Sequence, residues 1–145
     1  MEITVSLSLN KLRPEEVVRQ KLLRYLTEEL RFPASLISTE IAIGTLKRNS
    51  SNRRVDILCS VVDNDLIAPF LLIECKARKP TQKAFYQLAG YNTEIQAPYI
   101  AVVWESGMYC MKATPSGWQD CSKLPKYPSR MGVSKNSNCI YTQTS

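Results

Sequence analysis

The chain has 145 residues, 44% of them hydrophobic, and its 19 basic and 13 acidic residues give a net charge of +6. This length fits one domain with a sizeable core, and the positive charge suits a polyanionic partner such as nucleic acid. No apolar stretch approaches the roughly 20 residues of a membrane span. The first residues do not resemble a signal peptide, so we expect a cytoplasmic protein without membrane association.

The sequence contains no histidine and five cysteines. Without histidine, Ser-His-Asp and Cys-His catalysis are excluded, and acid–base chemistry falls to carboxylates, lysine, tyrosine or a metal-activated water. The cysteines form no CxxC pair, and their spacing does not suit a zinc site. Most lie in apolar or mixed runs, which is typical of reduced thiols in a reducing cytosol.

The first predicted element is a helix that begins near Pro14 and runs to about Arg31. Proline in the first turn and two glutamates after it favour a helix start, because acidic groups stabilise the positive end of the helix dipole. Apolar residues recur at helical spacing along one face. These residues are Val18, Leu22, Leu23, Leu26 and Leu30.

Three strands are predicted next, at about residues 36–46, 54–62 and 68–75, and we expect them to form an antiparallel meander. Asp63-Asn64-Asp65 is a tight turn between the second and third. A second helix follows at about 81–96, then strands at 99–104 and 108–113. We expect a single domain spanning 1–145, with a core at about 12–113 and an irregular tail at 114–145.

A charged pair closes the apolar run of the third predicted strand. The residues Phe70 to Ile73 lead into Glu74, Cys75 and Lys76. Because strand side chains alternate between faces, Glu74 and Lys76 share one face about 7 Å apart, and Cys75 points into the core. Glu-x-Lys alone is common on exposed strands, where the two charges simply pair.

A second carboxylate, Asp56, is embedded among apolar residues of the preceding strand. Burying it is costly without compensation, and the neighbouring strand could bring it level with Glu74. We predict that Asp56, Glu74 and the Cys75 carbonyl hold Mg²⁺ or Mn²⁺, which prefers such oxygen ligands. Lys76 would then orient a water or offset charge on a phosphate. The alternative is that both carboxylates pair with Lys76 or Arg54.

The pattern V-D-(x17)-E-C-K resembles the signature of the PD-(D/E)XK nucleases, and the element order resembles their core. Gln87-Leu88-Ala89-Gly90-Tyr91 is similar to the Q-x-x-x-Y motif of the RecB-like branch, and Pro14 to Gln20 resembles the opening helix of the N-terminal nuclease domain of type I restriction enzyme R subunits. The resemblance covers about residues 12–113. It implies a restriction-endonuclease-like α/β fold, with a mixed central sheet flanked by helices in the order α-β-β-β-α-β-β.

The resemblance also assigns roles to particular residues. It implies that Asp56 and Glu74 are metal ligands and that Lys76 is the catalytic lysine. Gln87 and Tyr91 are expected to support the site. The residue before the aspartate is valine rather than the proline of the signature.

One glutamate of the first helix usually faces the metal in this superfamily, and two candidates compete for that role. Glu16 is preferred over Glu15, because Gln20 lies on the same helix face one turn later. For both glutamates, the alternative is a favourable interaction with the helix dipole.

Basic residues cluster in two places, which would lie at the strand ends near Asp56 and Lys76. The predicted DNA contacts are Lys47, Arg48, Arg53, Arg54, Arg78, Lys79 and Lys83. Such side chains bind phosphates without reading base sequence, and the alternative is an ordinary solvated turn. Tyr86, Trp104 and Trp118 are expected to pack against other side chains rather than to stack on bases.

The predicted function is Mg²⁺-dependent DNA cleavage, with restriction as the context. No G-x-x-x-x-G-K-[ST] phosphate loop is present, so we expect a stand-alone relative or one domain of a larger protein, with restriction subunits or a motor domain as partners. Two alternatives stay open: a DNA-binding module that does not cut, and a protein-interaction domain. The sequence leaves open the DNA target and whether the domain forms a homodimer.

Overall fold

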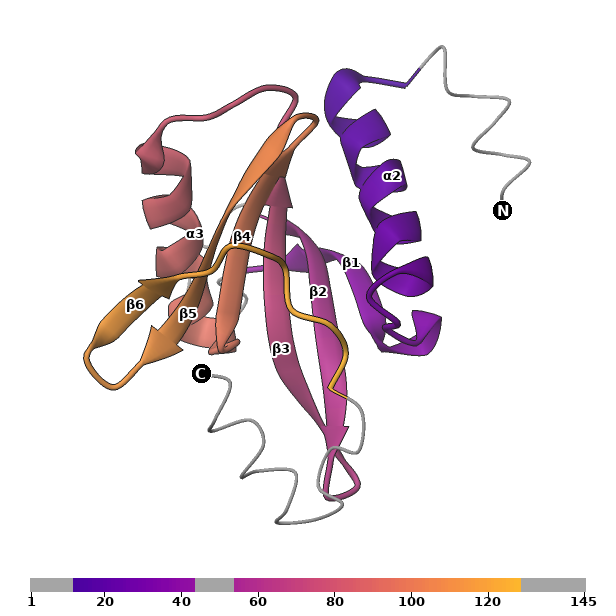
Figure 1. Cartoon of the computed structure of the whole chain (residues 1–145), viewed down its shortest axis with the longest axis vertical. Coiled ribbons are helices and arrows are strands. Elements are labelled where there is room, and N and C mark those ends of the chain that lie inside the picture. The colour runs from indigo at the N-terminus through magenta and orange to yellow at the C-terminus, as the bar shows by residue number, and fades with distance from the viewer. Residues whose placement is uncertain (1–11, 44–53, 129–145) are drawn as a thin grey trace.

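The computed structural model describes residues 12–43 and 54–128, which form a six-stranded open sheet with two helices (Figure 1). The elements are helix α2 (Pro14–Glu28), the 3₁₀ turn η2 (Ala34–Leu36), strands β1 (Ile37–Ala42), β2 (Arg54–Asp63) and β3 (Leu66–Cys75), helix α3 (Gln82–Ile95), and strands β4 (Tyr99–Trp104), β5 (Gly107–Thr114) and β6 (Gly117–Asp120). Within these described ranges, no helix is both long and apolar enough to cross a membrane.

The strands lie across the sheet in chain order, from β1 to β6. Neighbouring strands are antiparallel except for β3 and β4, which are parallel because α3 carries the chain back to the starting edge between them. The expected mixed sheet and the antiparallel meander of its first three strands are therefore confirmed.

The central strands alternate their side chains between two core clusters, one on each face of the sheet. In β3, Leu71 and Ile73 pack in the cluster that includes the predicted apolar stripe of α2. Leu72, which lies between them in sequence, packs instead with Phe85 and Leu88 of α3. The two helices consequently cover opposite faces, and the end of β3 emerges between them.

Helix α2 ends at Glu28, three residues before the predicted end at Arg31. The backbone turns at Arg31, whose φ is 69°, and the Phe32 N–H donates to the Leu26 carbonyl at 3.0 Å. A left-handed residue with such a long-range hydrogen bond is a common helix ending. Glycine usually occupies this position, and arginine gives no comparable signal in the sequence.

The expected irregular tail instead begins with a strand, β6, which pairs with β5 around a turn at Pro115-Ser116. The Thr114 hydroxyl donates to the Gly117 carbonyl at 2.6 Å, and Gly117 has a φ of 125°, which favours glycine. All four residues of β6 are exposed. The segment therefore lacks the alternation of apolar and polar residues that predicts a strand.

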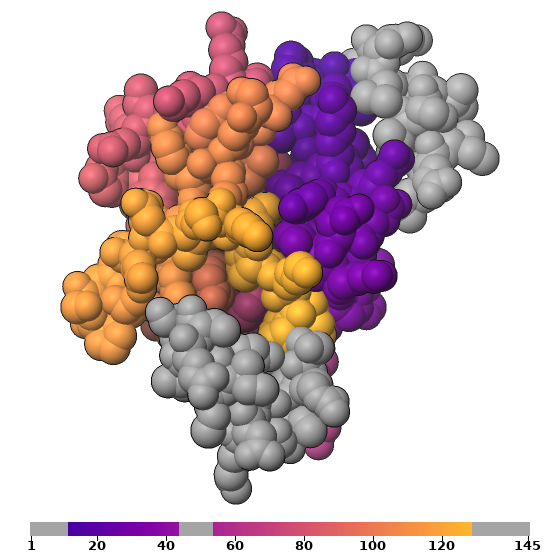
Figure 2. Space-filling model, viewed as in Figure 1, coloured from indigo at the N-terminus to yellow at the C-terminus, as the bar shows by residue number. Residues whose placement is uncertain are grey.

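After β6, residues 121–128 cross the sheet face that α2 covers, and Figure 2 shows their yellow atoms beside the indigo and purple ones. The Tyr127 N–H donates to the Leu30 carbonyl at 2.8 Å, and the Tyr127 ring lies edge-on to Phe32 with centroids 5.6 Å apart. Cys121 and Leu124 pack on the same cluster. The packed domain thus extends past the predicted core to residue 128.

Candidate functional site

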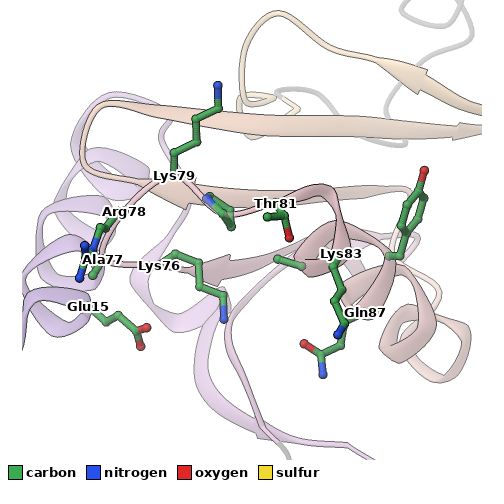
Figure 3. Close-up of a pocket in the computed structure, with 11 residues that line it drawn as sticks. Glu15, Lys76, Ala77, Arg78, Lys79, Thr81, Lys83 and Gln87 are labelled. Carbon is green, nitrogen blue, oxygen red and sulfur yellow. The ribbon is translucent and has the colours of Figure 1, made fainter.

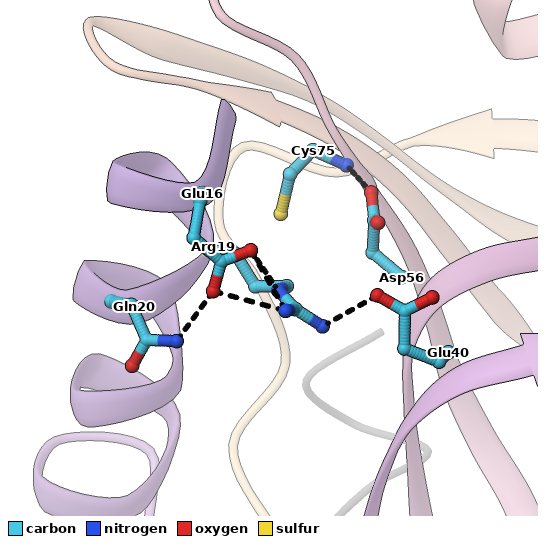
Figure 4. Close-up of polar contacts among 6 residues, drawn as sticks. All are labelled: Glu16, Arg19, Gln20, Glu40, Asp56 and Cys75. Atoms are coloured by element: carbon cyan, nitrogen blue, oxygen red, sulfur yellow. Dashed lines mark hydrogen bonds and ion pairs between the residues drawn. The ribbon is translucent and has the colours of Figure 1, made fainter. Parts of the chain in front are cut away.

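Asp56 lies between two other carboxylates on neighbouring strands. The register of β2 places it between Glu40 of β1 and Glu74 of β3, as the sequence predicts for Glu74. The Asp56 Oδ2 atom accepts a hydrogen bond from the Cys75 N–H at 2.7 Å (Figure 4). Burial raises the pKa of Asp56 above its ordinary value, although the Cys75 N–H and the nearby Arg19 oppose the increase.

Glu74 is the second partly buried carboxylate of this group. Its Oε1 atom is buried and has no hydrogen-bond partner among the described residues, and its Oε2 atom lies 3.6 Å from Lys76 Nζ. Burial and then the charge of Asp56 raise the pKa of Glu74 to about 7, against the opposing effect of Lys76. The expected placement of Glu74 and Lys76 on one face is confirmed, their ion pair is also what the alternative of simple charge pairing predicts, and Cys75 is buried in the core between them.

Asp56 and Glu74 suit a small divalent cation. Their charges repel each other, one Glu74 oxygen lacks a donor, and carboxylate oxygens are the ligands that Mg²⁺ prefers. Across residues 12–43 and 54–128, no three side chains of the ligand types His, Cys, Asp and Glu form a group that could hold a metal ion. Because Mg²⁺ keeps several waters and can be bound through one or two carboxylates, a site formed by this pair stays a prediction. A role for the Cys75 carbonyl stays a prediction.

Helix α2 contributes an ion-pair network at the same end of the sheet (Figure 4). Arg19 Nη2 lies 2.7 Å from Glu16 Oε1, and Arg19 Nη1 donates to Glu40 Oε2 at 3.1 Å. Gln20 also donates to Glu16, at 2.6 Å. Burial alone would raise the pKa of Glu16, but the hydrogen bonds from Gln20 and Arg19 outweigh it and lower the pKa.

Two hollows adjoin at this end of the molecule, and Glu15 lines both. The smaller, of about 360 Å³, is the acidic hollow, and the larger, of about 860 Å³, is the basic hollow. The acidic hollow is lined by Arg13, Pro14, Glu15, Glu16, Arg19, Glu40, Asp56 and Ala77. Glu16 lines only the acidic hollow, and its carboxylate already forms an ion pair with Arg19. The role predicted for Glu16 stays a prediction, and Glu15 is the glutamate that also reaches the lysine side.

The basic hollow opens beside Lys76 (Figure 3). Arg78, Lys79 and Lys83 line it together with Lys76, and so does Gln87 of α3. Figure 3 shows the Lys76 ammonium and the Gln87 amide directed toward the same space. Three of the predicted DNA contacts therefore share a surface with the predicted catalytic lysine.

The other predicted residues are placed differently. Arg54 is exposed at the start of β2, two residues before Asp56. Tyr91 packs against the core cluster under α3 and lines neither hollow, whereas Gln87 lines the basic hollow. Lys47, Arg48 and Arg53 lie outside the described residues.

Arg19 and Glu40 are not among the site residues predicted from the sequence. Glu16 and Arg19 are three residues apart on a helix, and this spacing could have indicated their pairing. Glu40 gives no such signal, because its partner is 21 residues away and its φ of 57° is unusual within a strand. That conformation occurs in β1 opposite Asp56, next to the site.

Replacing Arg19 with methionine should lower the free energy of unfolding by about 1–3 kcal/mol, because charged hydrogen bonds to Glu16 and Glu40 are lost. The Arg19 side chain is only 16% exposed, so water replaces these contacts poorly. Urea denaturation at neutral pH measures the change. As a control, Lys21→Met removes an exposed ion pair with Glu105 and should cost less than about 1 kcal/mol. Equal losses in the two variants would contradict the prediction.

Comparison with known protein families adds one further finding. Residues 14–128 match the model of the family described as type I restriction enzyme R protein N terminus. No curated protein matches the chain. The matched segment starts at the first residue of α2 and ends at the last described residue, so it contains all six described strands, the basic hollow, and every residue that lines the acidic hollow except Arg13.

Proposed function

Because the chain belongs to the family of type I restriction enzyme R protein N termini, we propose that it is a restriction-related, Mg²⁺-dependent DNA nuclease domain. The proposal rests mainly on the arrangement of Asp56 and Glu74 on adjacent strands. Lys76, which lines the basic hollow, has its Nζ atom 3.6 Å from Glu74. A surface that only binds phosphates has no use for partly buried carboxylates, which repel them.

The proposed fold is the restriction-endonuclease-like core of the PD-(D/E)XK nucleases. Three features of the domain support it: the helix before the three-strand meander, the parallel β3–β4 pair joined by α3, and the carboxylates of β2 and β3 at one end of the sheet. The sixth strand and residues 121–128 are additions beyond the core that the sequence predicts.

In this proposal, Asp56 and Glu74 hold Mg²⁺ or Mn²⁺. When bound, the cation supplies Lewis acidity toward a phosphate oxygen and lowers the pKa of a coordinated water. Lys76 places its positive charge where negative charge increases on the phosphate during cleavage. Gln87 hydrogen-bonds a DNA phosphate or the surroundings of Lys76, and Tyr91 supports the helix that carries it.

The proposed partner is DNA, held through its phosphates by the basic hollow. Arg78, Lys79 and Lys83 supply charge there, and Arg54 supplies it on the β2 side. Binding through such contacts should weaken steeply as salt increases, because counterions are released from DNA. Other restriction subunits or a motor domain are proposed as further partners, on the basis of the family alone.

Incubation with supercoiled plasmid DNA tests the proposal. The wild-type chain should nick or linearise the plasmid with Mg²⁺ or Mn²⁺, and Asp56→Asn should not, because it removes one of two charged metal ligands. The assay is repeated in cell extract, which provides partner subunits. Binding without cleavage in both settings would favour a non-cutting DNA-binding module. Failure to bind DNA at low salt would favour a protein-interaction domain.

A further inference from the structure

Two large aromatic side chains that contact Phe85 of α3 are exposed, although packing rather than base stacking is predicted for both from the sequence. Tyr86 lines the basic hollow and is 66% exposed, and Trp118 of β6 is 41% exposed. Both rings contact Phe85, with centroids 6.1 Å apart in each case. Tyr86 and Trp118 together are called the aromatic shelf. Trp104, by contrast, is 8% exposed and packs as predicted.

The shelf rests on a fixed support. Phe85 is 7% exposed and belongs to the core cluster between α3 and the sheet. Its ring meets those of Tyr86 and Trp118 at interplanar angles of 71° and 84°, so it contacts each of them in an edge arrangement. Because Tyr86 and Trp118 each contact this buried ring, their side chains lose less conformational entropy when a ligand binds to them.

Positive charge lies next to Tyr86, the member of the shelf that lines the basic hollow. Lys83 precedes Tyr86 by three residues on α3, so the two side chains share a helix face, and both line the basic hollow. Lys79 lines the same hollow. Cations beside an exposed aromatic ring match the alternation of phosphate and base along a nucleic acid strand.

Only an unpaired base can use this arrangement fully. In a duplex, both faces of each base are covered by stacking, and a protein contacts the base edges and the backbone. Proteins that bind single strands combine a positive groove with aromatic rings on which bases stack. Phosphate contacts alone would need the lysines but not the rings.

We propose that the aromatic shelf binds an unpaired base of DNA whose phosphates lie along the basic hollow. The domain would accordingly take DNA that carries a single-stranded segment, such as a gap, a flap or a melted end. The inference rests on the proposed function, because it specifies the form of DNA presented to the same site. It concerns binding, however, and therefore has a measurement that does not depend on cleavage.

The test compares fluorescently labelled oligo-dT with a blunt duplex of equal length, by anisotropy titration in EDTA and low salt. Tyr86→Ala should weaken oligo-dT binding about 5- to 100-fold, because base–aromatic stacking is lost. Tyr86→Phe keeps the ring and should bind like the wild type, whereas duplex binding should change less than about two-fold in both variants. Trp118→Ala should also weaken oligo-dT binding. Tyr25→Ala, which removes an exposed tyrosine from α2, is the control and should bind normally.

Each result bears on the inference separately from the nuclease proposal. Unchanged oligo-dT binding in Tyr86→Ala, or equal losses for oligo-dT and duplex, would overturn the shelf. A wild-type chain that binds oligo-dT through Tyr86 but never cuts would leave the shelf standing and remove the nuclease activity. A wild-type chain that binds neither oligo-dT nor duplex would overturn both the shelf and DNA binding. Plasmid cleavage that persists in Asp56→Asn would then be assigned to a contaminating nuclease.

Discussion

The Lys76→Ala variant is expected to cleave DNA about 10²- to 10³-fold more slowly than the wild type, the usual loss when a group that stabilises transition-state charge is removed. Its affinities for DNA and for Mg²⁺ should change little, because Lys76 is one of four basic side chains at the hollow and is not a metal ligand. Single-turnover cleavage at saturating DNA gives the rate, and titration in EDTA gives the DNA affinity.

A matched control separates catalysis from general loss of charge. Lys123→Ala removes an exposed lysine from residues 121–128, on the sheet face that α2 covers, and should cut at the wild-type rate. The catalytic role would be refuted by a Lys76→Ala variant that cuts normally once DNA is saturating. In that case Lys76 would be a phosphate contact, and the whole defect would lie in affinity.

Glu74→Gln should stabilise the metal-free domain at pH 8 by roughly 3 kcal/mol, the value that corresponds to a pKa raised by burial from 4.5 to about 7. A raised carboxyl pKa means that the folded state holds its proton more tightly than the unfolded state. The contribution of Glu74 to the free energy of unfolding is therefore fully present below pH 4.5 and is lost as the pH rises through about 7. Glutamine carries no charge and avoids the loss, so the two proteins should converge near pH 4.5.

Thermal denaturation in EDTA across this pH range measures the difference. Adding Mg²⁺ should raise the melting temperature of the wild type and not that of Glu74→Gln, because the ion binds only the folded pair of carboxylates. Glu105→Gln, at an exposed turn position, should show neither effect. A wild-type protein as stable at pH 8 as Glu74→Gln would mean that Glu74 is compensated by a neighbour and needs no cation.

Much of the site follows from local geometry that a sequence carries. Alternation along a strand puts Glu74 and Lys76 on one face whatever the rest of the fold does. The short turn at Asn64-Asp65 sets the register of the strand ends beside it, because both residues take positive φ. An irregularity between Cys59 and Ser60 then shifts the register of β2 against β3, and the shifted register brings Asp56 level with Glu74. Strand alternation and turn chemistry span few residues and can be predicted from the sequence, whereas the register shift is seen only in the structure.

Other parts depend on how separate elements dock. Arg19 reaches Glu40 only because α2 packs on the face from which β1 presents that carboxylate. Tyr86 looks like a core residue beside Phe85 in sequence, but successive helix residues point about 100° apart, and only one of them can face the sheet. All residues of strand β6 are exposed, so the strand is stabilised mainly by its backbone hydrogen bonds to the edge of β5.

By itself, the sequence determined the order of helices and strands as far as β5, the shared face of Glu74 and Lys76, and the basic residues that follow them. These features rest on interactions between neighbours in the chain, whereas the placement of Asp56 level with Glu74 also depends on the register shift between β2 and β3. Only the tertiary structure decided that Arg19 also reaches Glu40, that Glu15 lines both hollows, and that Tyr86 is exposed where it lines the basic hollow. Those outcomes depend on the rotation of a helix about its own axis against the sheet, which the whole core sets through packing rather than any local pattern.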